Sequence, residues 1–582
     1  GNDGKARLDG LPDGYITIHV KMVGYHLHEM SVTLPYMEGQ PVEVFLSPKV
    51  FETPILVEAT RANRTVEDLP TRTEVLTEEI DEAASMEASK ISHLITHSTG
   101  IQVQTTAATS GGAVVRIQGM QGRYTQMLID GFPLYGGLSG SLDILQIPPL
   151  DLRQVEFVKG PASTLYGGGA IGGLVNLLSK TPDSDESLIH MNISHIGAKD
   201  FNAFFARKYN RFGMTNLASM HLHAPYDADG DGYSDIAQVM KFNYNPKIFF
   251  YPDEKTELYI GGQAQVDNRM GGDMNFFDDS LASATTFYYD KQKSTRFTSQ
   301  VRVKTELQGR GTLSIKNSIT HFDRYVEIRE NALGDLARFG GSQLRTFTEG
   351  NYNLQKKKHN LTLGLNIYTS DFREDVYDTD SLRDENSLTY GGFVNHLWDI
   401  HQKFATELGL RIDHNQSNSF ADSLGSAKTF VLPRLSMLFK ATKKFSIRAG
   451  GGMGYRMPTI FNEESEPYGY KGIQTIRFSD LTPEQSYGAN LDFKFMSNFG
   501  TKNFLLSLNQ MFFYNHITNP IILTAPSIGV YAYDNFGDNM SSRGFESQIK
   551  MTIWKFTWFF GYTFTDALIQ DGDVNYALAL TP

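Results

Sequence analysis

The sequence predicts a mostly-β protein whose larger part is an antiparallel β-barrel that spans a membrane. From about residue 183 onward, apolar and polar residues alternate in segment after segment, as strands with one apolar and one polar face require. The connections between these segments are short and long in turn, a rhythm typical of outer-membrane barrels. No run of about eighteen apolar residues occurs, which excludes a transmembrane helix but not a barrel strand.

Composition narrows the classes of function. The 582 residues include 53 Gly, 28 Tyr and 39 Phe but no Cys, so disulfides and thiolate metal sites are excluded. The net charge of -12 argues against nucleic acid as a partner. No Ser-His-Asp set and no pair of carboxylates stands out by its spacing, and we therefore expect no enzyme.

Residues 544–553 show the strand pattern most clearly. One face carries the polar residues Glu546, Gln548, Lys550 and Thr552, and the other carries Phe545, Ile549, Met551 and Ile553. Short turns are expected at residues 253–256, 308–310, 356–358 and 442–444. The hairpins predict about seventeen strands, whereas plugged barrels close with about 22 strands. We therefore expect the chain to be a fragment that lacks both its N-terminus and about five final strands.

The pattern divides the chain into four parts: a small, partial β-sandwich over residues 1–50, a linker over 51–64, a compact α/β region over 65–182, and the barrel over 183–582. In the third part we predict a helix that starts near residue 76 and a second over 88–95. Strands are expected over 114–119, 126–133 and 155–158.

The third part contains a pattern with two interpretations. Gly167, Gly169 and Gly172 follow a strand-like run and match the dinucleotide-binding spacing. That site needs the glycines to open a helix whose N-terminus meets the phosphates. Here Pro182 follows too soon for such a helix, and no alternation of strands and helices comes after it. The nucleotide interpretation is therefore rejected.

The same stretch, residues 147–180, closely resembles the distal plug motif of TonB-dependent outer-membrane transporters. Residues 126–133 and 455–458 are similar to two further motifs of that family, and the order of the motifs is intact. Gln118 and Lys159 stand where the family usually has Arg, which puts specific ion pairs between plug and barrel in doubt. The plug-motif residues that the resemblance identifies are Arg116, Asp130, Gly131, Gly160, Pro161, Tyr166, Gly167, Gly172, Gly173 and Asn176.

Two N-terminal features extend the resemblance. Residues 3–15 look like part of the carboxypeptidase regulatory-like domain of Bacteroidetes-type transporters, which would lie in the periplasm. A segment within the linker is similar to the TonB box, which pairs with the energy-transducing TonB complex through main-chain hydrogen bonds. This segment consists of Thr53, Pro54, Ile55, Leu56, Val57, Glu58 and Ala59.

An acidic loop predicts a calcium site on the extracellular side. Its spacing of oxygen ligands reproduces the start of an EF-hand, with a Gly at the sixth position for the tight turn. Gln238 replaces the Glu expected at the twelfth position, and a flexible acidic loop without a metal is the alternative. The expected ligands are Asp227, Asp229, Asp231, Tyr233 (through its carbonyl) and Asp235.

The resemblance implies a ligand-gated active transporter in the outer membrane, surrounded by lipid and driven by TonB. A ferric siderophore is the favoured metal-chelate cargo, and cobalamin import with extracellular Ca²⁺ is one alternative. The other is a surface binding or adhesion barrel without transport. Ligand contacts are expected from Tyr135, Tyr468 and Tyr470, while the lack of His between residues 458 and 481 disfavours haem. The resemblance also allows for a surface lipoprotein partner, and implies no organic cofactor.

Overall fold

The computed structural model describes residues 14–20, 28–34, 44, 55–62, 64–77, 79–80, 82–83, 91–106, 111–134, 137–138, 140–142, 144–277, 287–307, 309, 311–329, 336–377, 382–499, 504–554 and 556–578. The chain forms two compact units, Gly1–Leu56 and Val57–Pro582. In the first unit, β1 (Gly14–Val20) pairs with β2 (His28–Leu34) in an antiparallel hairpin. The rest of the predicted β-sandwich falls almost entirely outside the described residues.

Antiparallel strands dominate the second unit, as the alternation predicts. Among the described residues, eighteen of them form one sheet in which neighbours in the chain are neighbours in space, close to the predicted count of about seventeen. Between β26 and β29 the chain inserts a hairpin made of β27 (Ile521–Ser527) and β28 (Val530–Asn535). The strands of the sheet are β12 (Glu186–Ile193), β13 (Lys199–Tyr209), β14 (Phe212–His223), β15 (Gln238–Asp253), β16 (Thr256–Gly272), β17 (Tyr289–Leu307), β18 (Gly311–Arg329), β19 (Leu336–Lys356), β20 (His359–Glu374), β21 (Glu385–His401), β22 (Phe404–Ser419), β23 (Asp422–Lys440), β24 (Phe445–Arg456), β25 (Glu484–Phe499), β26 (Phe504–Thr518), β29 (Asn539–Ile553), β30 (Phe556–Asp571) and β31 (Val574–Ala577).

The two faces of this sheet differ in polarity. On β29, Glu546 is buried on the inner face, whereas Ile549 and Ile553 are exposed on the outer face. The same rule holds on other strands, where Ile248, Phe297 and many other apolar side chains lie on the outside. A sheet with an apolar exterior and a polar interior suits a barrel in lipid. No helix among the described residues is long and apolar enough to cross a membrane.

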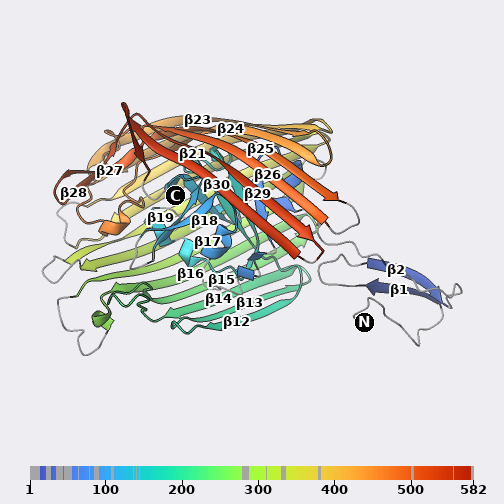
Figure 1. Ribbon diagram of the computed structural model, residues 1–582, viewed down its shortest axis with the longest axis horizontal. Coiled ribbons are helices and arrows are strands. Elements are labelled where there is room, and N and C mark those ends of the chain that lie inside the picture. Colours follow the sequence, from blue (N-terminus) through green and yellow to red (C-terminus); the bar gives the residue numbers. More distant parts are fainter. Residues whose placement is uncertain are drawn as a thin grey trace. The chain divides into compact units, whose positions relative to one another are not determined.

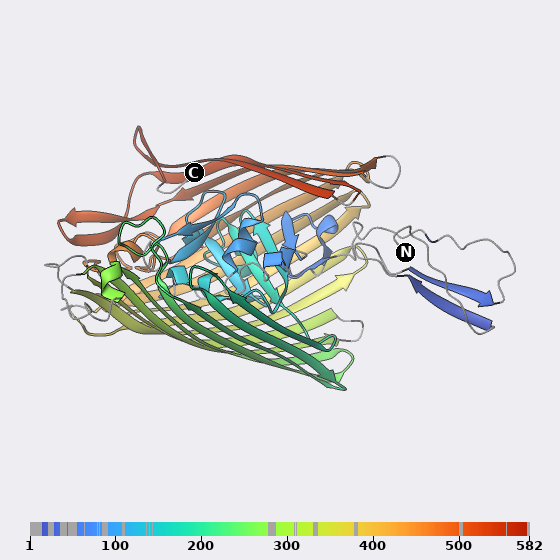
Figure 2. The same ribbon diagram turned by 60° about the horizontal axis from the view of Figure 1, so that its bottom comes forward.

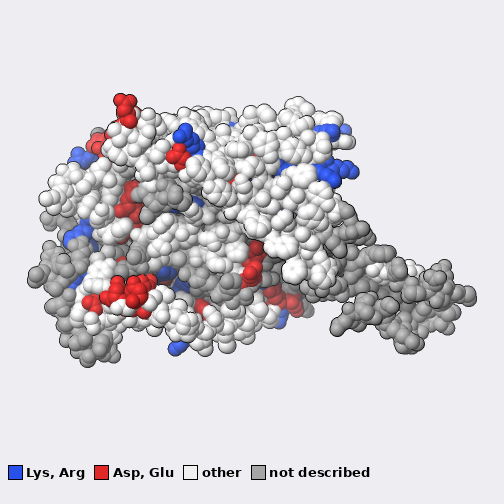
Figure 3. All heavy atoms as spheres, viewed as in Figure 1, with Lys and Arg blue, Asp and Glu red and all other residues white. Residues whose placement is uncertain are grey.

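The connections confirm the short and long rhythm, except that β22 and β23 are joined by only two residues, 420–421, at the long-loop end. At one end, the turns of two to four residues lie where the sequence predicts them, for example between β19 and β20. The other end carries the loops over residues 224–237, 273–288, 457–483 and 519–538, with η5 (Met274–Phe277) and η6 (Glu466–Tyr468) inside them. Figure 3 shows Asp and Glu gathered toward this long-loop end.

The plug lies inside the curved sheet (Figures 1 and 2). Its main sheet has the order β5-β10-β11-β8-β9, in which β11 and β8 are parallel and the other neighbours are antiparallel. Its elements are β3 (Leu56–Val57), β4 (Arg64–Thr65), η1 (Val66–Asp68), β5 (Thr73–Leu76), α2 (Ser92–Thr96), β6 (Ile101–Thr105), β7 (Ala113–Ile117), η2 (Gly122–Tyr124), β8 (Thr125–Ile129), β9 (Phe132–Pro133), η3 (Gly140–Leu142), η4 (Ile144–Gln146), β10 (Leu152–Lys159), α3 (Ser163–Tyr166) and β11 (Gly173–Ser179).

The plug strands match the predictions closely, and the helices match them in part. Residues 79–80 and 82–83 are helical, and α2 covers the end of the second predicted helix and one residue beyond it. The glycine-rich stretch leads into strand β11 and not into a helix, which confirms that the dinucleotide interpretation fails.

Candidate ligand cavity and plug gate

One plug motif is a strained turn that is ion-paired to the barrel wall. Asp130 and Gly131 connect β8 to β9 with positive φ angles of 52° and 74°. The Asp130 carboxylate accepts hydrogen bonds from Ser179 N (2.9 Å) and Ser179 Oγ (2.6 Å), and it pairs with Lys247 Nζ of β15 at 3.0 Å. Burial alone would raise the pKa of Asp130, but the Lys247 ammonium and the Ser179 hydrogen bonds outweigh it and lower the pKa to about 2.

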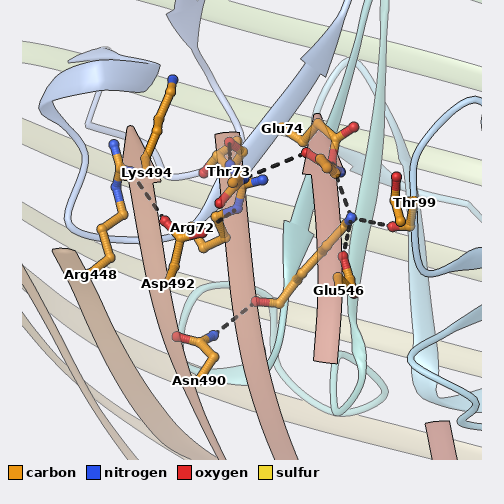
Figure 4. Close-up of polar contacts among 12 residues, drawn as sticks. Arg72, Thr73, Glu74, Thr99, Arg448, Asn490, Asp492, Lys494 and Glu546 are labelled. Atoms are coloured by element: carbon orange, nitrogen blue, oxygen red, sulfur yellow. Dashed lines mark hydrogen bonds and ion pairs between the residues drawn. The ribbon is translucent and has the colours of Figure 1, made fainter. Parts of the chain in front are cut away.

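Lys159, which replaces the usual Arg before Gly160-Pro161, makes the expected type of contact. Its fully buried ammonium lies 3.0 Å from Glu74 of the plug and 2.8 Å from Glu546 of β29, and it also donates to the carbonyl of Thr99 (Figure 4). Asn490 donates to the carbonyl of Lys159 at 3.2 Å. An ion pair between plug and barrel is therefore present at this position, although Lys159 replaces the usual Arg.

A second ionic cluster lies beside it. Asp492 of β25 forms ion pairs with Arg72 of the plug at 3.5 Å and with Arg448 of β24 at 3.4 Å (Figure 4). Arg448 also donates to the carbonyls of Leu69 (2.9 Å) and Val66 (3.1 Å). Sequence reasoning missed these residues, because the plug residues and their barrel partners are separated by hundreds of positions in the chain.

Gln118 is neutral, whereas the family usually has a charged Arg at this position. Its side chain accepts a hydrogen bond from Asn515 Nδ2 at 3.1 Å, and its carbonyl accepts one from Ser542 Oγ at 2.6 Å. The neighbouring motif residue Arg116 is buried and pairs with Glu463 of the long 457–483 loop. The contact at Gln118 is thus neutral, and the ionic contact lies two residues earlier.

The glycine-rich turn lets the plug touch the wall directly. A Cβ on Gly168 would lie 3.0 Å from the Tyr455 ring, and one on Gly167 would lie 3.1 Å from Asp413 and Arg411. The Gly169 amide donates to the Tyr455 carbonyl at 3.1 Å. These glycines therefore serve a close approach to the Tyr455-Arg456 motif of β24.

A cavity of about 310 Å³ lies above this turn, toward the long-loop end. Arg345 lines it and is held by Ser370 Oγ at 3.1 Å, and Arg456 lines it and donates to the Arg123 carbonyl. Among the described residues, neither guanidinium has a carboxylate within ion-pair distance. Of the four described carboxylates that line the cavity, three are already paired with other Arg residues. The polar lining includes Arg123, Gln126, Gln343, Arg345, Asn366, Glu385, Arg411, Asp413, Arg456, Glu463 and Glu466.

The three tyrosines predicted to contact ligand differ in position. Tyr470 is only 1% exposed, because its ring stacks on Phe339 at 4.3 Å and its hydroxyl donates to Glu466 at 3.0 Å. Its ring packs inside the loop, and its contact with a ligand stays a prediction. Tyr468 is 42% exposed and packs beside Tyr531. Tyr135 lies outside the described residues.

The TonB-box-like segment enters the plug at its C-terminal half. Thr53 and Pro54 lie outside the described residues, and Ile55 and Leu56 end the first unit. Val57 and Ala59 are fully buried among plug residues such as Leu174. The amides of Glu58 and Ala59 each donate to the Glu156 carboxylate at 2.7 Å.

Two arginines that follow this segment, Arg61 and Arg64, form ion pairs with strands of the barrel. Arg61 pairs with Glu349 of β19, and its guanidinium lies 4.5 Å from the centre of the Tyr166 ring, which gives that motif tyrosine a contact. Arg64 forms a two-pronged pair with Asp399 of β21 at 2.8 and 2.7 Å.

The acidic loop between β14 and β15 folds as a compact turn. Asp227 accepts hydrogen bonds from Gly232 N (2.9 Å) and Gly230 N (2.7 Å), which lower the pKa of its carboxyl. Oxygen atoms of Asp227, Asp229 and Asp235 lie within 4.8 Å of one another, while Asp231 is not part of this group. Three of the predicted ligands are therefore close enough to share one cation.

These features define a class of protein: a membrane β-barrel that is filled by a plug, with paired charges holding the plug and a polar cavity above it. Comparison with protein families makes the class specific. The family described as "TonB dependent receptor-like, beta-barrel" matches residues 202–582, and "TonB-dependent Receptor Plug Domain" matches residues 65–174. The chain therefore belongs to the TonB-dependent receptors, which work with TonB and are receptors or transporters, not enzymes.

Individual relatives are distant. The vitamin B12 transporter BtuB of Vibrio cholerae serotype O1 is 20% identical over 475 residues, which cover 78% of this chain and 68% of that protein. The siderophore receptor PirA from Acinetobacter baumannii has a TM-score of 0.68 at 17% identity, covering 90% of this chain and 83% of the other. The ferric-catecholate import receptor Fiu from E. coli K12 has a TM-score of 0.66 at 14% identity, covering 88% and 81%. At these identities the solved structures show a shared fold.

Proposed function

We propose that this receptor is a ligand-gated active transporter that imports a scarce anionic metal chelate, with a ferric siderophore as the favoured cargo. The observation that carries this proposal is the pair of cavity guanidiniums, Arg345 and Arg456, which have no carboxylate partner among the described residues. Guanidinium groups bind carboxylates and other planar anions through charge-assisted hydrogen bonds. Solved structures of the same fold are named as a siderophore receptor, a ferric-catecholate import receptor and a ferric yersiniabactin uptake receptor.

The proposed mechanism places energy coupling at residues 53–59. The ligand binds the cavity and the outer loops, and TonB takes up the segment by adding a strand to it. Force on the segment then opens a path through the plug. In this proposal the first unit is a regulatory-like domain of the Bacteroidetes type in the periplasm.

Ligand binding by the purified receptor tests the cargo class. We expect ferric catecholates to bind and cyanocobalamin not to bind, measured by fluorescence quenching. The double variant Arg345→Gln with Arg456→Gln should weaken ferric-catecholate binding by about 100-fold, because two charge-assisted contacts are lost. Arg373→Gln, at an exposed Arg that does not line the cavity, is the matched control. Equal affinity of both variants would remove the anionic-ligand argument, and tight cyanocobalamin binding would favour the cobalamin alternative.

Uptake tests transport itself. A strain whose receptor lacks residues 53–59 should bind the chelate at the cell surface but accumulate none. Uptake that persists in this strain would contradict the coupling mechanism. Unimpaired binding without uptake by the intact receptor would instead indicate a binding or adhesion barrel.

A further inference from the structure

Glu156 is a buried residue in the middle of β10. It contacts the TonB-box-like residues 53–59, called the coupling segment below, and it was not among the residues predicted from the sequence. Its side chain is 0% exposed. Oε1 accepts from the Glu58 amide (2.7 Å) and from Gln154 Nε2 (2.7 Å), and Oε2 accepts from the Ala59 amide (2.7 Å) and from Asn176 Nδ2 (3.0 Å). Four N–H donors therefore satisfy both carboxylate oxygens.

Glu156 is connected by further hydrogen bonds to the turn between β8 and β9 at the opposite edge of the plug sheet. Asn176 of β11 donates to Glu156 with its Nδ2, and its Oδ1 accepts from the Gly131 amide at 3.1 Å. Gly131 follows Asp130, which is ion-paired to Lys247 of the barrel. One chain of hydrogen bonds thus leads from the coupling segment through Glu156 and Asn176 to a turn that is fixed to the wall.

The two amides that Glu156 holds belong to the segment itself. A strand added by a partner along residues 57–59 needs main-chain hydrogen bonds from this same stretch. An amide proton that Glu156 holds is not free for a partner strand. Removing the segment also takes two of four donors from a buried carboxylate, which is costly.

We propose that Glu156 is a catch: its carboxylate retains residues 57–59 in the plug, and release of this contact precedes capture of the segment by the partner. The proposal rests on the proposed function, in which residues 53–59 are the segment that TonB takes up. Glu156 acts as a positioning residue, and Asn176 connects it to the Asp130 turn.

A buried thiol reports on the catch directly. The chain has no Cys, so Val57→Cys places one thiol at a fully buried position of the segment. In the purified full chain, without ligand or partner, we expect a fluorescent maleimide to label this introduced thiol slowly. Glu156→Gln keeps the shape but loses the charge and turns an NH₂ group toward two N–H donors. It should raise the labelling rate about ten-fold or more.

Two controls separate release from unfolding. Asp151→Asn changes another buried plug carboxyl, and none of its contacts within the described residues reaches residues 57–59, so it should leave the labelling rate at position 57 within about two-fold. Leu177→Cys, at a fully buried plug position in a different hydrophobic cluster from Val57, should stay protected in the Glu156→Gln receptor with Val57 retained. If the thiol at position 177 is labelled, Glu156→Asp replaces Glu156→Gln, because it keeps the charge and shortens the reach.

Slow labelling at position 57 in a folded Glu156→Gln or Glu156→Asp receptor would overturn the catch. Capture by the purified periplasmic domain of TonB is the second measurement, since a merely structural role would not change it. Glu156→Gln should increase capture about ten-fold without ligand. Fast labelling without increased capture would support the catch and contradict the proposed coupling through this segment, so the two failures are distinguishable.

Discussion

The charged side chains at the two ends of the plug differ in the number of polar or oppositely charged partners that they contact. At the apex, near the long loops, Arg345 and Arg456 face a cavity without a carboxylate partner among the described residues. At the base, nearer the short turns, Lys159, Asp130 and Glu156 are buried and each has several partners. The apex can gain free energy from an anionic ligand, whereas the base can only lose contacts. Ligand binding and plug opening thus need different sources of energy.

This difference explains why a transporter of this design would need an energised partner. Breaking a buried ion pair by removing one member costs about 3–5 kcal/mol, and the base contains several such pairs. A single ligand contact at the apex returns about 1.5–3 kcal/mol. Binding alone is therefore too weak to open the base, and in the proposed mechanism force applied at residues 53–59 supplies the remaining free energy.

The largest effect should come from removing the central cation of the base. Lys159→Met leaves the half-buried Glu74 and the buried Glu546 without their shared ammonium, and we expect the plug to lose about 3–5 kcal/mol of stability. The measurement is the urea dependence of plug proteolysis in the purified receptor. Lys159→Arg, which restores the residue common in the family, should cost less than about 1 kcal/mol. Equal stability of the Met variant and the native receptor would show that the base is not held by charge.

Sequence reasoning predicted the barrel because its signals are local. Alternation within 544–553 and the turn at 356–358 depend on residues next to one another, and the structure has them as expected. The partners of the motif residues are not local. Glu546 lies 387 positions from Lys159, and Lys247 lies 117 positions from Asp130, so one sequence contains no signal that connects them.

Two features of the sites could not be seen in the sequence. Tyr470 stands in a long, aromatic loop, which suggested a ligand contact, and in the structure its ring is buried and stacks on Phe339. Glu156 lies inside a predicted strand, and the sequence predicted no role for it, because an acidic residue in a strand usually faces water. Its burial depends on four donors from β10, β11 and the coupling segment, which only the tertiary fold brings together.

An intermediate effect is expected at the Asp130 turn, and it depends on pH. The folded-state pKa of Asp130 is about 2, below the ordinary value of 3.8. The pair with Lys247 therefore contributes stability that is fully present above about pH 4 and is lost as the pH falls toward 2. Asp130→Asn should cost about 2 kcal/mol at pH 7 and remove this acid dependence. Amide hydrogen exchange of β11 between pH 2 and 5, corrected for intrinsic rates, measures it. A native receptor and variant with parallel profiles would contradict the pairing as the cause.

A smaller effect is expected at the acidic loop, where carboxylates are crowded instead of paired. If Asp227, Asp229 and Asp235 bind Ca²⁺, an ion concentration about ten times the dissociation constant stabilises the loop by ~1.4 kcal/mol. Calorimetric titration with CaCl₂ and proteolysis of residues 224–237 measure binding and its effect. Asp229→Asn should abolish both, while Asp534→Asn on another long loop should change neither. No heat and no protection in the native receptor would leave a loop held by its amide hydrogen bonds alone.

The smallest effect on stability should come from Arg345 and Arg456, the cations that the proposed function assigns to ligand binding. Arg456 is half-buried beside Arg123, and neither Arg456 nor Arg345 has a carboxylate of the described residues within ion-pair distance, so neutralising either one breaks no ion pair. We expect Arg345→Gln and Arg456→Gln to change plug stability by less than about 0.5 kcal/mol in the absence of ligand. The same urea–proteolysis measurement used for Lys159→Met compares both ends of the plug directly. A loss of several kcal/mol at Arg345 would mean that this cavity cation retains the plug as the charges of the base do, and the division between a binding end and a retaining end would fail.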